Sequence, residues 1–412
     1  MKSSTSLAIP RTAALAAALA CLTPLASQAG DWRQFRGPLG RDIAGEASLP
    51  ATLDADTNIA WKIPLPGRGL SSPIIVGDRI YVTAASGPQQ KTLHVLCFSA
   101  KDGGKLWERR FQATGRTMTH DKTSVAAPTP VSDGRQIFAL YSSNDLVCLD
   151  LDGNLLWMRG LTLDYPNASN SLGMASSPVV IGDVLVVQVE NDSESFAAGI
   201  DVRTGMNRWK LDRPKLANWT SPQQMTDPDN GRPVVALQSS TGIDAVDPAT
   251  GRTVWTFGDG ASTIPSSASG KDVLYVPSNG LTALQPDPGS SQPRQLWNSR
   301  TLRPGTASPV LWRDLVFVLN AAGVLNCGSA KDGERLWQLR LKGAFSATPV
   351  GAGHHLYCVN ETGQVQVVDV TAPEGEIVGS LDLGETVLGT PSIAGDALYL
   401  RSDGNLWKIS QP

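Results

Sequence analysis

One phrase recurs eight times along this chain of 412 residues: usually a proline, a short apolar run and an aspartate, followed by a strand-like segment. Most copies continue to a turn and a tryptophan, as in SSPVVIGDVLVVQ running on to GIDVRTGMNRW. The anchors are Pro73/Asp78, Pro128/Asp133, Pro178/Asp183, Pro222/Asp227, Ser267/Asp272, Pro309/Asp314, Pro349/His354 and Pro391/Asp396. A period of about 40 to 50 residues indicates a repeat architecture in which each repeat forms one structural unit.

Within each repeat, apolar and polar residues alternate in short runs such as RIYVTA, DLVFVLN and QVQVVDV, a pattern typical of strands. Asp-Gly or Thr-Gly pairs, as in AKDGGKLW and VRTGMNRW, stand between two strands where a hairpin needs positive φ. Each repeat therefore supplies about four antiparallel strands. Eight such repeats predict an all-β fold, an eight-bladed β-propeller of four-stranded antiparallel blades.

The two ends of the chain predict how this ring closes. The last repeat starts at Asp396 and has too few residues before Pro412 to reach a final tryptophan strand. Trp61 has no repeat start in front of it, yet it lies 17 residues before Asp78, the interval that also separates Trp255 from Asp272. The strand around Trp61 should therefore complete the eighth blade.

The tryptophans at the repeat ends are expected to pack between neighbouring blades, because a large apolar side chain that recurs at one position is core. They are Trp61, Trp107, Trp157, Trp209, Trp255, Trp297 and Trp337. The seventh repeat has Gly379 at this position, which predicts a weaker contact between blades there.

The N-terminus predicts a secretory signal peptide over residues 1–29, followed by a lead segment over 30–57 and the propeller over 58–412. Basic residues precede the apolar run from Thr12 to Leu22, and the small residues of LASQAG follow it. We expect a periplasmic or secreted protein. Acylation at Cys21 is the alternative, although Ala18 and Leu19 depart from the usual lipoprotein pattern. Elsewhere no apolar run approaches the roughly 18 residues of a transmembrane segment.

Composition and motifs exclude several classes of function. A formal net charge of −3, without any basic run, argues against a nucleic-acid partner. The cysteines that follow the signal form no C-x-x-C pair, and His354-His355 lacks spaced acidic or cysteine partners. We therefore expect no metal site. We also expect the propeller to be monomeric.

Two intervals depart from the repeat and predict where function resides. Trp107 to Asp133 and Trp157 to Asp183 each span 26 residues, so two inter-blade connections carry nine extra residues. Additions to a regular scaffold are common sites of function. We predict a partner-binding face at the channel mouth over blades 1 to 3, with a solvated loop as the alternative. The candidate residues are Arg116, His120, Asp121 and Lys122 in the first connection, Asp164, Tyr165, Asn167 and Asn170 in the second, and Arg68 and Trp219 in other approach segments.

The segments DWRQFRGPLG, AWKIPLPGRGLSSPIIVGDRIYVT and AAPTPVSDGRQIFAL, with the repeated D..TG...W, resemble the PQQ-like β-propeller repeat proteins, which include the BamB outer-membrane-assembly lipoproteins. The resemblance covers nearly the whole chain after the signal, and it is specific for fold rather than activity. It implies an extracytoplasmic, non-enzymatic scaffold that binds a protein or a glycan and needs no cofactor. The alternative is an oxidoreductase that uses PQQ with calcium. Dehydrogenases of this fold resemble one another in having adjacent cysteines above the quinone, which this sequence lacks.

Overall fold

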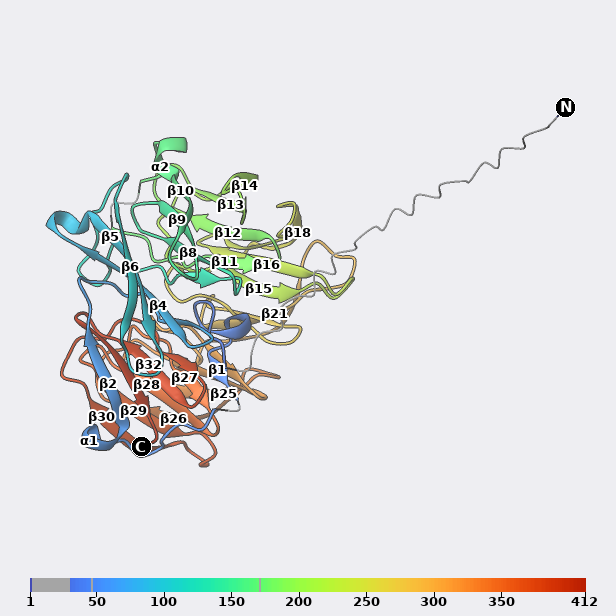
Figure 1. The fold of residues 1–412 in the computed structure, drawn as a ribbon. Helices are drawn as coiled ribbons and strands as arrows, with labels where there is room; N and C mark the ends of the chain where they lie inside the picture. Colours follow the sequence, from blue (N-terminus) through green and yellow to red (C-terminus); the bar gives the residue numbers. More distant parts are fainter. Residues whose placement is uncertain (2–29, 46, 170–171) are drawn as a thin grey trace.

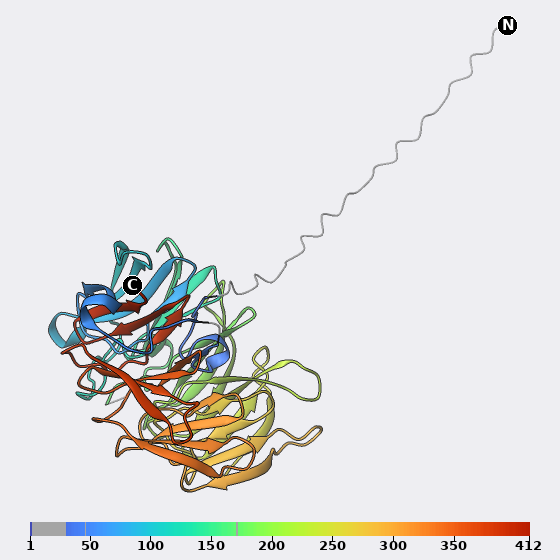
Figure 2. The same ribbon diagram turned by 90° about the horizontal axis from the view of Figure 1, so that it is seen from below.

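The computed structural model describes residue 1 and residues 30–45, 47–169 and 172–412. All eight repeats fall within these ranges, whereas most of the predicted signal peptide, Cys21 and the candidate Asn170 lie outside them. Each repeat forms one antiparallel sheet, and the eight sheets follow one another around a ring (Figures 1 and 2). The prediction of an eight-bladed, all-β propeller is confirmed.

The strands of blades 1 to 4 have the following bounds. They are β3 (Ile74–Val76), β4 (Arg79–Ser86), β5 (Thr92–Ser99) and β6 (Lys105–Gln112); β7 (Val131–Ser132), β8 (Gln136–Leu140), β9 (Asp145–Asp150) and β10 (Leu155–Gly160); β11 (Val179–Ile181), β12 (Val184–Val189), β13 (Phe196–Asp201) and β14 (Asn207–Asp212); β15 (Gln223–Thr226), β16 (Pro233–Ser239), β17 (Gly242–Val246) and β18 (Thr253–Phe257).

Blades 5 to 8 continue in the same order. Their strands are β19 (Ala268–Ser269), β20 (Leu274–Val276), β21 (Leu281–Gln285) and β22 (Arg294–Ser299); β23 (Val310–Trp312), β24 (Leu315–Leu319), β25 (Val324–Ser329) and β26 (Arg335–Arg340); β27 (Val350–Ala352), β28 (His355–Val359), β29 (Gln364–Asp369) and β30 (Glu376–Asp382), with β1 (Ile43–Ala44) added beside β27; β31 (Ser392–Ala394), β32 (Ala397–Arg401), β33 (Asn405–Ser410) and β2 (Ile59–Pro64). The helical segments are short: η1 (Pro38–Gly40), α1 (Ala55–Asn58), η2 (Pro88–Gln90) and α2 (Leu161–Asp164). In the described part of the chain, none is long and apolar enough to cross a membrane.

Strand β2 closes the ring as the sequence predicts. It pairs antiparallel with β33 and places Trp61 opposite Lys408, so the outermost strand of blade 8 comes from the N-terminal part of the chain. Figure 1 shows β2, in blue, among the red strands of the C-terminal blades. The ring of Trp61 lies 6.1 Å from that of Tyr399, which joins the two ends of the chain through one apolar cluster.

The repeat tryptophans contact the next blade in the ring. The Nε1 of Trp107 donates a 3.0 Å hydrogen bond to the Leu151 carbonyl, and the Nε1 of Trp157 donates a 2.9 Å bond to the Val202 carbonyl. The Trp107 ring lies against the turn at Gly153, where an added Cβ would come within 2.7 Å of the ring. Each of these two tryptophans therefore joins its own outer strand to a turn of its neighbour.

Gly379 departs from our expectation of a weak contact. A Cβ at this position would lie 2.2 Å from the Ala51 carbonyl oxygen and 3.1 Å from the Cα of Thr52. The lead segment therefore runs across the site that a tryptophan fills in other blades. The contact is replaced by main chain, because the lead segment must pass here before β2 completes the ring.

The lead segment also enters the central channel from one face, the turn face. We define this face by the turns between the first two strands of each blade, and the connection face, opposite, by the inter-blade connections. Asp31 Oδ1 accepts a 2.8 Å bond from Gly77 N in such a turn, and Trp32 pairs with Ile75 of blade 1. Figure 2 shows the blue segment that carries η1 near the centre of the ring. Strand β1 then pairs in parallel with β27 of blade 7.

Candidate functional site

The channel opens on the connection face as a funnel with a closed floor. Its cavity has a volume of about 390 Å³ and is lined by residues from all eight inter-blade connections, including Leu70, Ala175, Trp219 and Leu388. Phe35 of the lead segment is the lining residue that comes from the opposite end of the channel. Because the lead segment fills the channel below it, a molecule that enters the funnel meets Phe35 as its floor.

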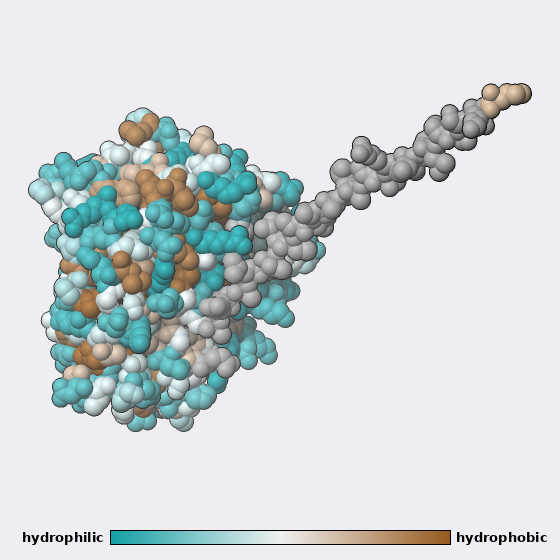
Figure 3. Space-filling model, viewed as in Figure 1, coloured by the Kyte–Doolittle hydropathy of each residue, from teal (hydrophilic) through white to brown (hydrophobic). Residues whose placement is uncertain are grey.

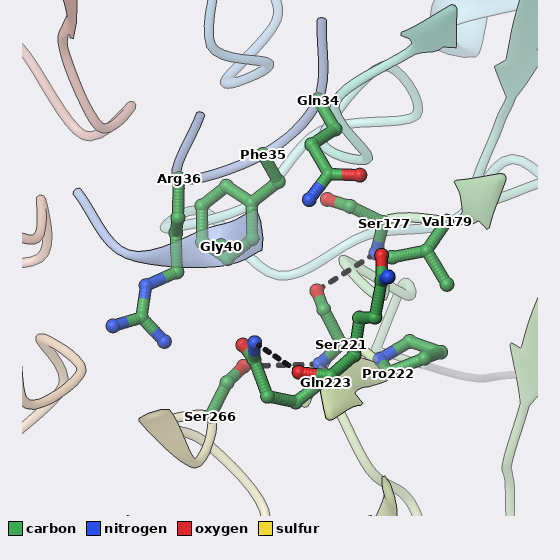
Figure 4. A pocket seen from close by; sticks show the side chains of 11 residues that line it. Gln34, Phe35, Arg36, Gly40, Ser177, Val179, Ser221, Pro222, Gln223 and Ser266 are labelled. Atoms are coloured by element: carbon green, nitrogen blue, oxygen red, sulfur yellow. Dashed lines mark hydrogen bonds between the residues drawn. The ribbon is translucent and has the colours of Figure 1, made fainter. Parts of the chain in front are cut away.

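A ring of hydroxyl groups surrounds this floor. In seven of the eight blades a serine or threonine side chain at the start of the inner strand accepts a hydrogen bond from the backbone N–H of its counterpart in the preceding blade, at 2.9–3.1 Å. The ring residues are Ser72, Thr129, Ser177, Ser221, Ser266, Ser308, Thr348 and Thr390. Figure 4 shows Phe35 together with Ser177, Ser221 and Ser266 and the hydrogen bonds that join these three. Each bond joins one blade to the next, and together the bonds stabilise the ring.

The hydroxyl ring is interrupted where the chain closes on itself. Within the described ranges the Ser72 hydroxyl has no hydrogen-bond partner, although it is buried. Ser72 belongs to blade 1, and its missing donor would be Thr390 N of blade 8. The boundary between blades 8 and 1 is instead joined by other hydrogen bonds, from Ser392 to the Pro73 carbonyl and from Arg401 to the Ser71 hydroxyl.

The first long connection covers part of the funnel mouth. Lys122 Nζ forms a 2.8 Å ion pair with Glu361 Oε2 of blade 7, so the connection reaches past blades 1 and 8. Burial acts to raise the pKa of Glu361, but the hydrogen bonds from Lys122 and Ser346 outweigh it and lower the pKa below its usual value. Arg68 donates to the Asp121 carbonyl and lies 3.3 Å from Asp403. These contacts hold the connection over the mouth.

Three of the predicted candidates line the funnel: His120, Lys122 and Trp219. The Nε1 of Trp219 donates a 2.8 Å bond to the Gly173 carbonyl, which fixes the indole against the second long connection. The two long connections also contact each other, because the backbone N–H of His120 donates to the Leu172 carbonyl at 2.9 Å. The structure therefore joins the predicted additions into one rim.

The other candidates lie away from the cavity. Tyr165 packs on Phe196 with ring centroids 4.5 Å apart, and its hydroxyl accepts a 2.7 Å bond from Asn207. The Asn167 carbonyl accepts a bond from the hydroxyl of Ser193 in a loop of blade 3. Asp164 forms an ion pair with Arg159, and Arg116 is exposed and contacts Met118. This part of the second connection covers the outer region of blade 3 rather than the funnel.

The comparisons with known proteins agree with this geometry. A family described as outer membrane protein assembly factor BamB matches residues 45–219, 239–372 and 321–411, which together span most of the chain. The chain belongs to the BamB family. It is 23% identical over 346 residues to the outer membrane protein assembly factor BamB of Moranella endobia (strain PCIT), covering 79% of this chain and 82% of that protein.

Solved structures show the same fold. BamB from Moraxella catarrhalis is similar with a TM-score of 0.61 and 18% identity, covering 86% of this chain and 97% of that one. A europium-containing methanol dehydrogenase gives a TM-score of 0.72 at 12% identity, covering 93% and 98%. A quinohemoprotein alcohol dehydrogenase from Comamonas testosteroni gives 0.69 at 12%, covering 92% and 80%. At these identities the likeness shows the fold alone. BamB and the two dehydrogenases have the same propeller architecture as this chain, so the structural likeness does not distinguish between their functions.

The funnel lining does not fit a calcium-dependent quinone site. It offers hydroxyl, imidazole and ammonium groups but no carboxylate, whereas calcium prefers carboxylate and carbonyl oxygens. The described residues also contain no group of three or more His, Cys, Asp or Glu side chains that could hold a metal ion. Cys97, Cys148, Cys327 and Cys358 are buried free thiols, and burial raises the pKa of Cys97 to about 12. This member of the BamB family therefore presents a polar, uncharged ring where a metal-dependent site would need acidic ligands.

Sequence reasoning missed the hydroxyl ring and the aromatic floor. The ring did leave a signal, because a serine or threonine directly precedes the anchor residue in seven of the eight repeats, as in Ser177-Pro178 and Ser308-Pro309. In the second repeat Thr129 instead follows the anchor Pro128. Phe35 left none, since it lies outside the repeats and reaches the cavity only because the lead segment folds back into the channel.

A relay of polar side chains inside blade 1 was also missed. Ser86 Oγ lies 2.6 Å from His94 Nε2, and His94 Nδ1 lies 3.0 Å from Glu108 Oε1. Hydrogen bonds from Arg110, then Lys105 and His94, lower the pKa of Glu108 to about 2 against the effect of burial. The ionised carboxylate can only accept, so His94 Nδ1 carries the hydrogen and donates it to Glu108. Because the relay joins β4, β5 and β6 and His94 is only 2% exposed, we assign it a role in holding blade 1 together.

Proposed function

We propose that this chain is an exported, non-enzymatic scaffold that binds a segment of a partner protein at the funnel mouth, in the manner that the name outer membrane protein assembly factor implies for its BamB relatives. One observation carries the proposal: among the described residues, the lead segment lies in the channel, and the cavity that all eight connections line opens on the connection face, where the two long connections form a rim. A closed funnel with loops at its mouth suits binding rather than passage.

Exposed apolar side chains at the mouth support a protein partner. Leu172 and Ile264 are exposed and line the funnel. Met118 and Leu216 are exposed on two other inter-blade connections of the same face. Exposed apolar groups that cluster at a loop-lined opening are typical of a site of interaction. On the side of the molecule seen in Figure 3, by comparison, small apolar groups are separated by hydrophilic surface. A glycan partner at the same mouth is the alternative, and it would use the polar lining more than these side chains.

The proposal is tested by photo-crosslinking in the producing cell. A photoreactive amino acid at Ile264 should capture one defined envelope protein, and Trp219→Ala should weaken that capture. The matched control is the same amino acid at Met206, which is also exposed but lies in a turn on the opposite face. Equal capture from both positions, or capture from neither, would show that the mouth is not the binding face.

We also propose that the protein holds no redox cofactor. The support for this is that the funnel lining contains no carboxylate that could bind the calcium ion of a PQQ site. Purified protein titrated with PQQ and calcium should leave the quinone absorption unchanged and should not reduce a dye with alcohols or sugars. A saturable spectral shift with dye reduction would favour the oxidoreductase instead.

A further inference from the structure

The hydroxyl ring carries hydrogen-bond donors that the protein itself does not use. Within the described ranges, each of its seven acceptor hydroxyls receives a backbone N–H, yet none donates its own hydrogen to a protein atom. A hydroxyl has one donor hydrogen beside its acceptor lone pairs. Six of the ring residues line the funnel, and none of them is more than 6% exposed. Their hydrogens are therefore available to a molecule inside the cavity.

The charges around the ring favour an anionic group. No aspartate or glutamate lines the funnel. The neighbouring Glu361 carboxylate accepts hydrogen bonds from Lys122 and Ser346, not from the ring hydroxyls, so it does not compete with an anion for these donors. Behind the blade 1 connection lies Arg401, which is 2% exposed. Among the described residues no carboxylate forms a direct ion pair with it, and Asp403, whose charge acts on it, is paired with Arg68 instead. Its guanidinium donates to the Ser71 hydroxyl at 2.9 Å and to backbone carbonyls, all of them neutral.

This guanidinium lies next to the cavity wall. Ser71 is flanked by Leu70, which lines the funnel, and by Ser72 of the ring. Burial lowers the pKa of Arg401 to about 9, so the side chain keeps its charge at neutral pH. A buried cation that no carboxylate contacts directly is costly, and an anion held in the neighbouring cavity would reduce that cost.

The rest of the lining favours an apolar body on the same molecule. Leu70, Ala127, Ala175, Trp219 and Ile264 form the wall, and Phe35 forms the floor. The closed floor matters here, because it admits the end of a chain or a small molecule but not the middle of a polypeptide.

We propose that the funnel binds a carboxylate attached to an apolar body, with the carboxylate oxygens accepting hydrogen bonds from the hydroxyl ring. Two sources share this chemistry: the C-terminus of a partner polypeptide and a free apolar carboxylic acid. The polypeptide source rests on the proposed function, and it specifies which part of the partner enters the funnel.

Calorimetry with the full-length mature protein tests the inference. The probes are acetyl-Ala-Leu-Leu as the free acid and as the C-terminal amide, together with octanoate and octanamide. In at least one pair the acid should bind about tenfold or more tightly than the amide, since a hydrogen bond to a charged group is roughly twice as strong as a neutral one. The pair that shows the difference identifies the source.

Variants of the ring give the second readout. Thr348→Val should lower the affinity for the acid about tenfold, and Thr348→Ser, which restores a hydroxyl, should recover most of it. Ser72→Ala is the matched control, because the Ser72 hydroxyl belongs to the same ring but has no partner and does not line the funnel. Thermal unfolding of each variant shows whether it has folded, and the comparison of acid with amide on the unaltered protein needs no variant.

Two results would overturn the inference: equal or absent binding of acid and amide in both pairs, or an equal loss in Ser72→Ala and Thr348→Val. If crosslinks from Ile264 to a partner persist in that case, the proposed function stands and only the carboxylate is wrong. If the acid binds but no crosslink forms, the funnel is a small-molecule site and the partner proposal fails.

Discussion

Arg36 holds the lead segment in the channel, and we expect its removal to be costly. Its Nε forms an ion pair with Asp42, and the two side chains are 2% and 0% exposed. Its Nη1 donates to the Ser267 carbonyl at 2.8 Å and its Nη2 to the Pro309 carbonyl at 2.5 Å. One side chain thus joins the lead segment to blades 5 and 6. Burial raises the pKa of Asp42 to about 7 even beside Arg36. Arg36→Met would leave this carboxyl buried without its partner, so it would either take up a proton or remain as an uncompensated charge, and two carbonyls would lose their donors.

The magnitude follows from this burial. Breaking a buried ion pair by removing one partner costs about 3–5 kcal/mol. With an unfolding entropy of roughly 2.1 cal/mol/K per residue over a propeller of this length, the melting temperature should fall by about 4–6 °C. The free energy of unfolding is measured from urea denaturation, and amide hydrogen exchange over residues 31–43 reports whether the lead segment leaves the channel.

Two further variants sharpen the experiment. In Arg36→Met/Asp42→Asn the uncompensated charge is gone, so the double variant should be more stable than Arg36→Met alone. Asparagine suits position 42, where φ is 60°. The matched control is Arg41→Met, because Arg41 is exposed in the same segment, and its effect should stay within about 0.5 kcal/mol. Equal stability of Arg36→Met and Arg41→Met, or no recovery in the double variant, would refute the reasoning.

Three other predictions follow from particular contacts. Gly379→Ala should cost about 1–3 kcal/mol, because its Cβ must displace the Ala51 carbonyl; Gly258→Ala, with open space around it, is the control, and equal melting temperatures would contradict the close approach. Glu108 contributes stability above its unfolded pKa of 4.5, and this stability is lost as the pH falls toward its folded pKa of about 2. The free energies of unfolding of the protein and of Glu108→Gln should therefore differ above pH 4.5 and converge below it. A difference that stays constant with pH would contradict this role of Glu108. Trp61→Ala should cost about 3–5 kcal/mol through lost contacts at the ring closure, with Trp61→Phe intermediate by urea unfolding.

The sequence was sufficient for the parts of this protein that depend on local pattern. Alternating residues and Asp-Gly turns predict strands and hairpins, because side-chain direction in a strand and positive φ in a turn are set by neighbouring residues. The pairing of β2 with β33 was also predictable, since the interval from Trp61 to Asp78 matches the other repeats. For the candidate site, the sequence indicated the two long connections, and the structure joins His120 and Trp219 to one rim.

What the sequence could not show depends on residues far apart in the chain. Besides Asp42, the partners of Arg36 are two carbonyls more than two hundred residues away. Carbonyls belong to every residue, so no side-chain pattern marks these two. At Gly379 the sequence lacks the tryptophan of the other repeats, and no local pattern shows that the main chain of the lead segment packs there instead.

The serines and threonines beside the anchors were visible as a repeat. Only the ring places them around one cavity, because eight equivalent positions converge when the blades share an axis. Repetition in the sequence thus determined the scaffold. That this BamB-family propeller has a funnel with a floor was decided by the tertiary structure, because the ring closes and the N-terminal segment returns into its channel.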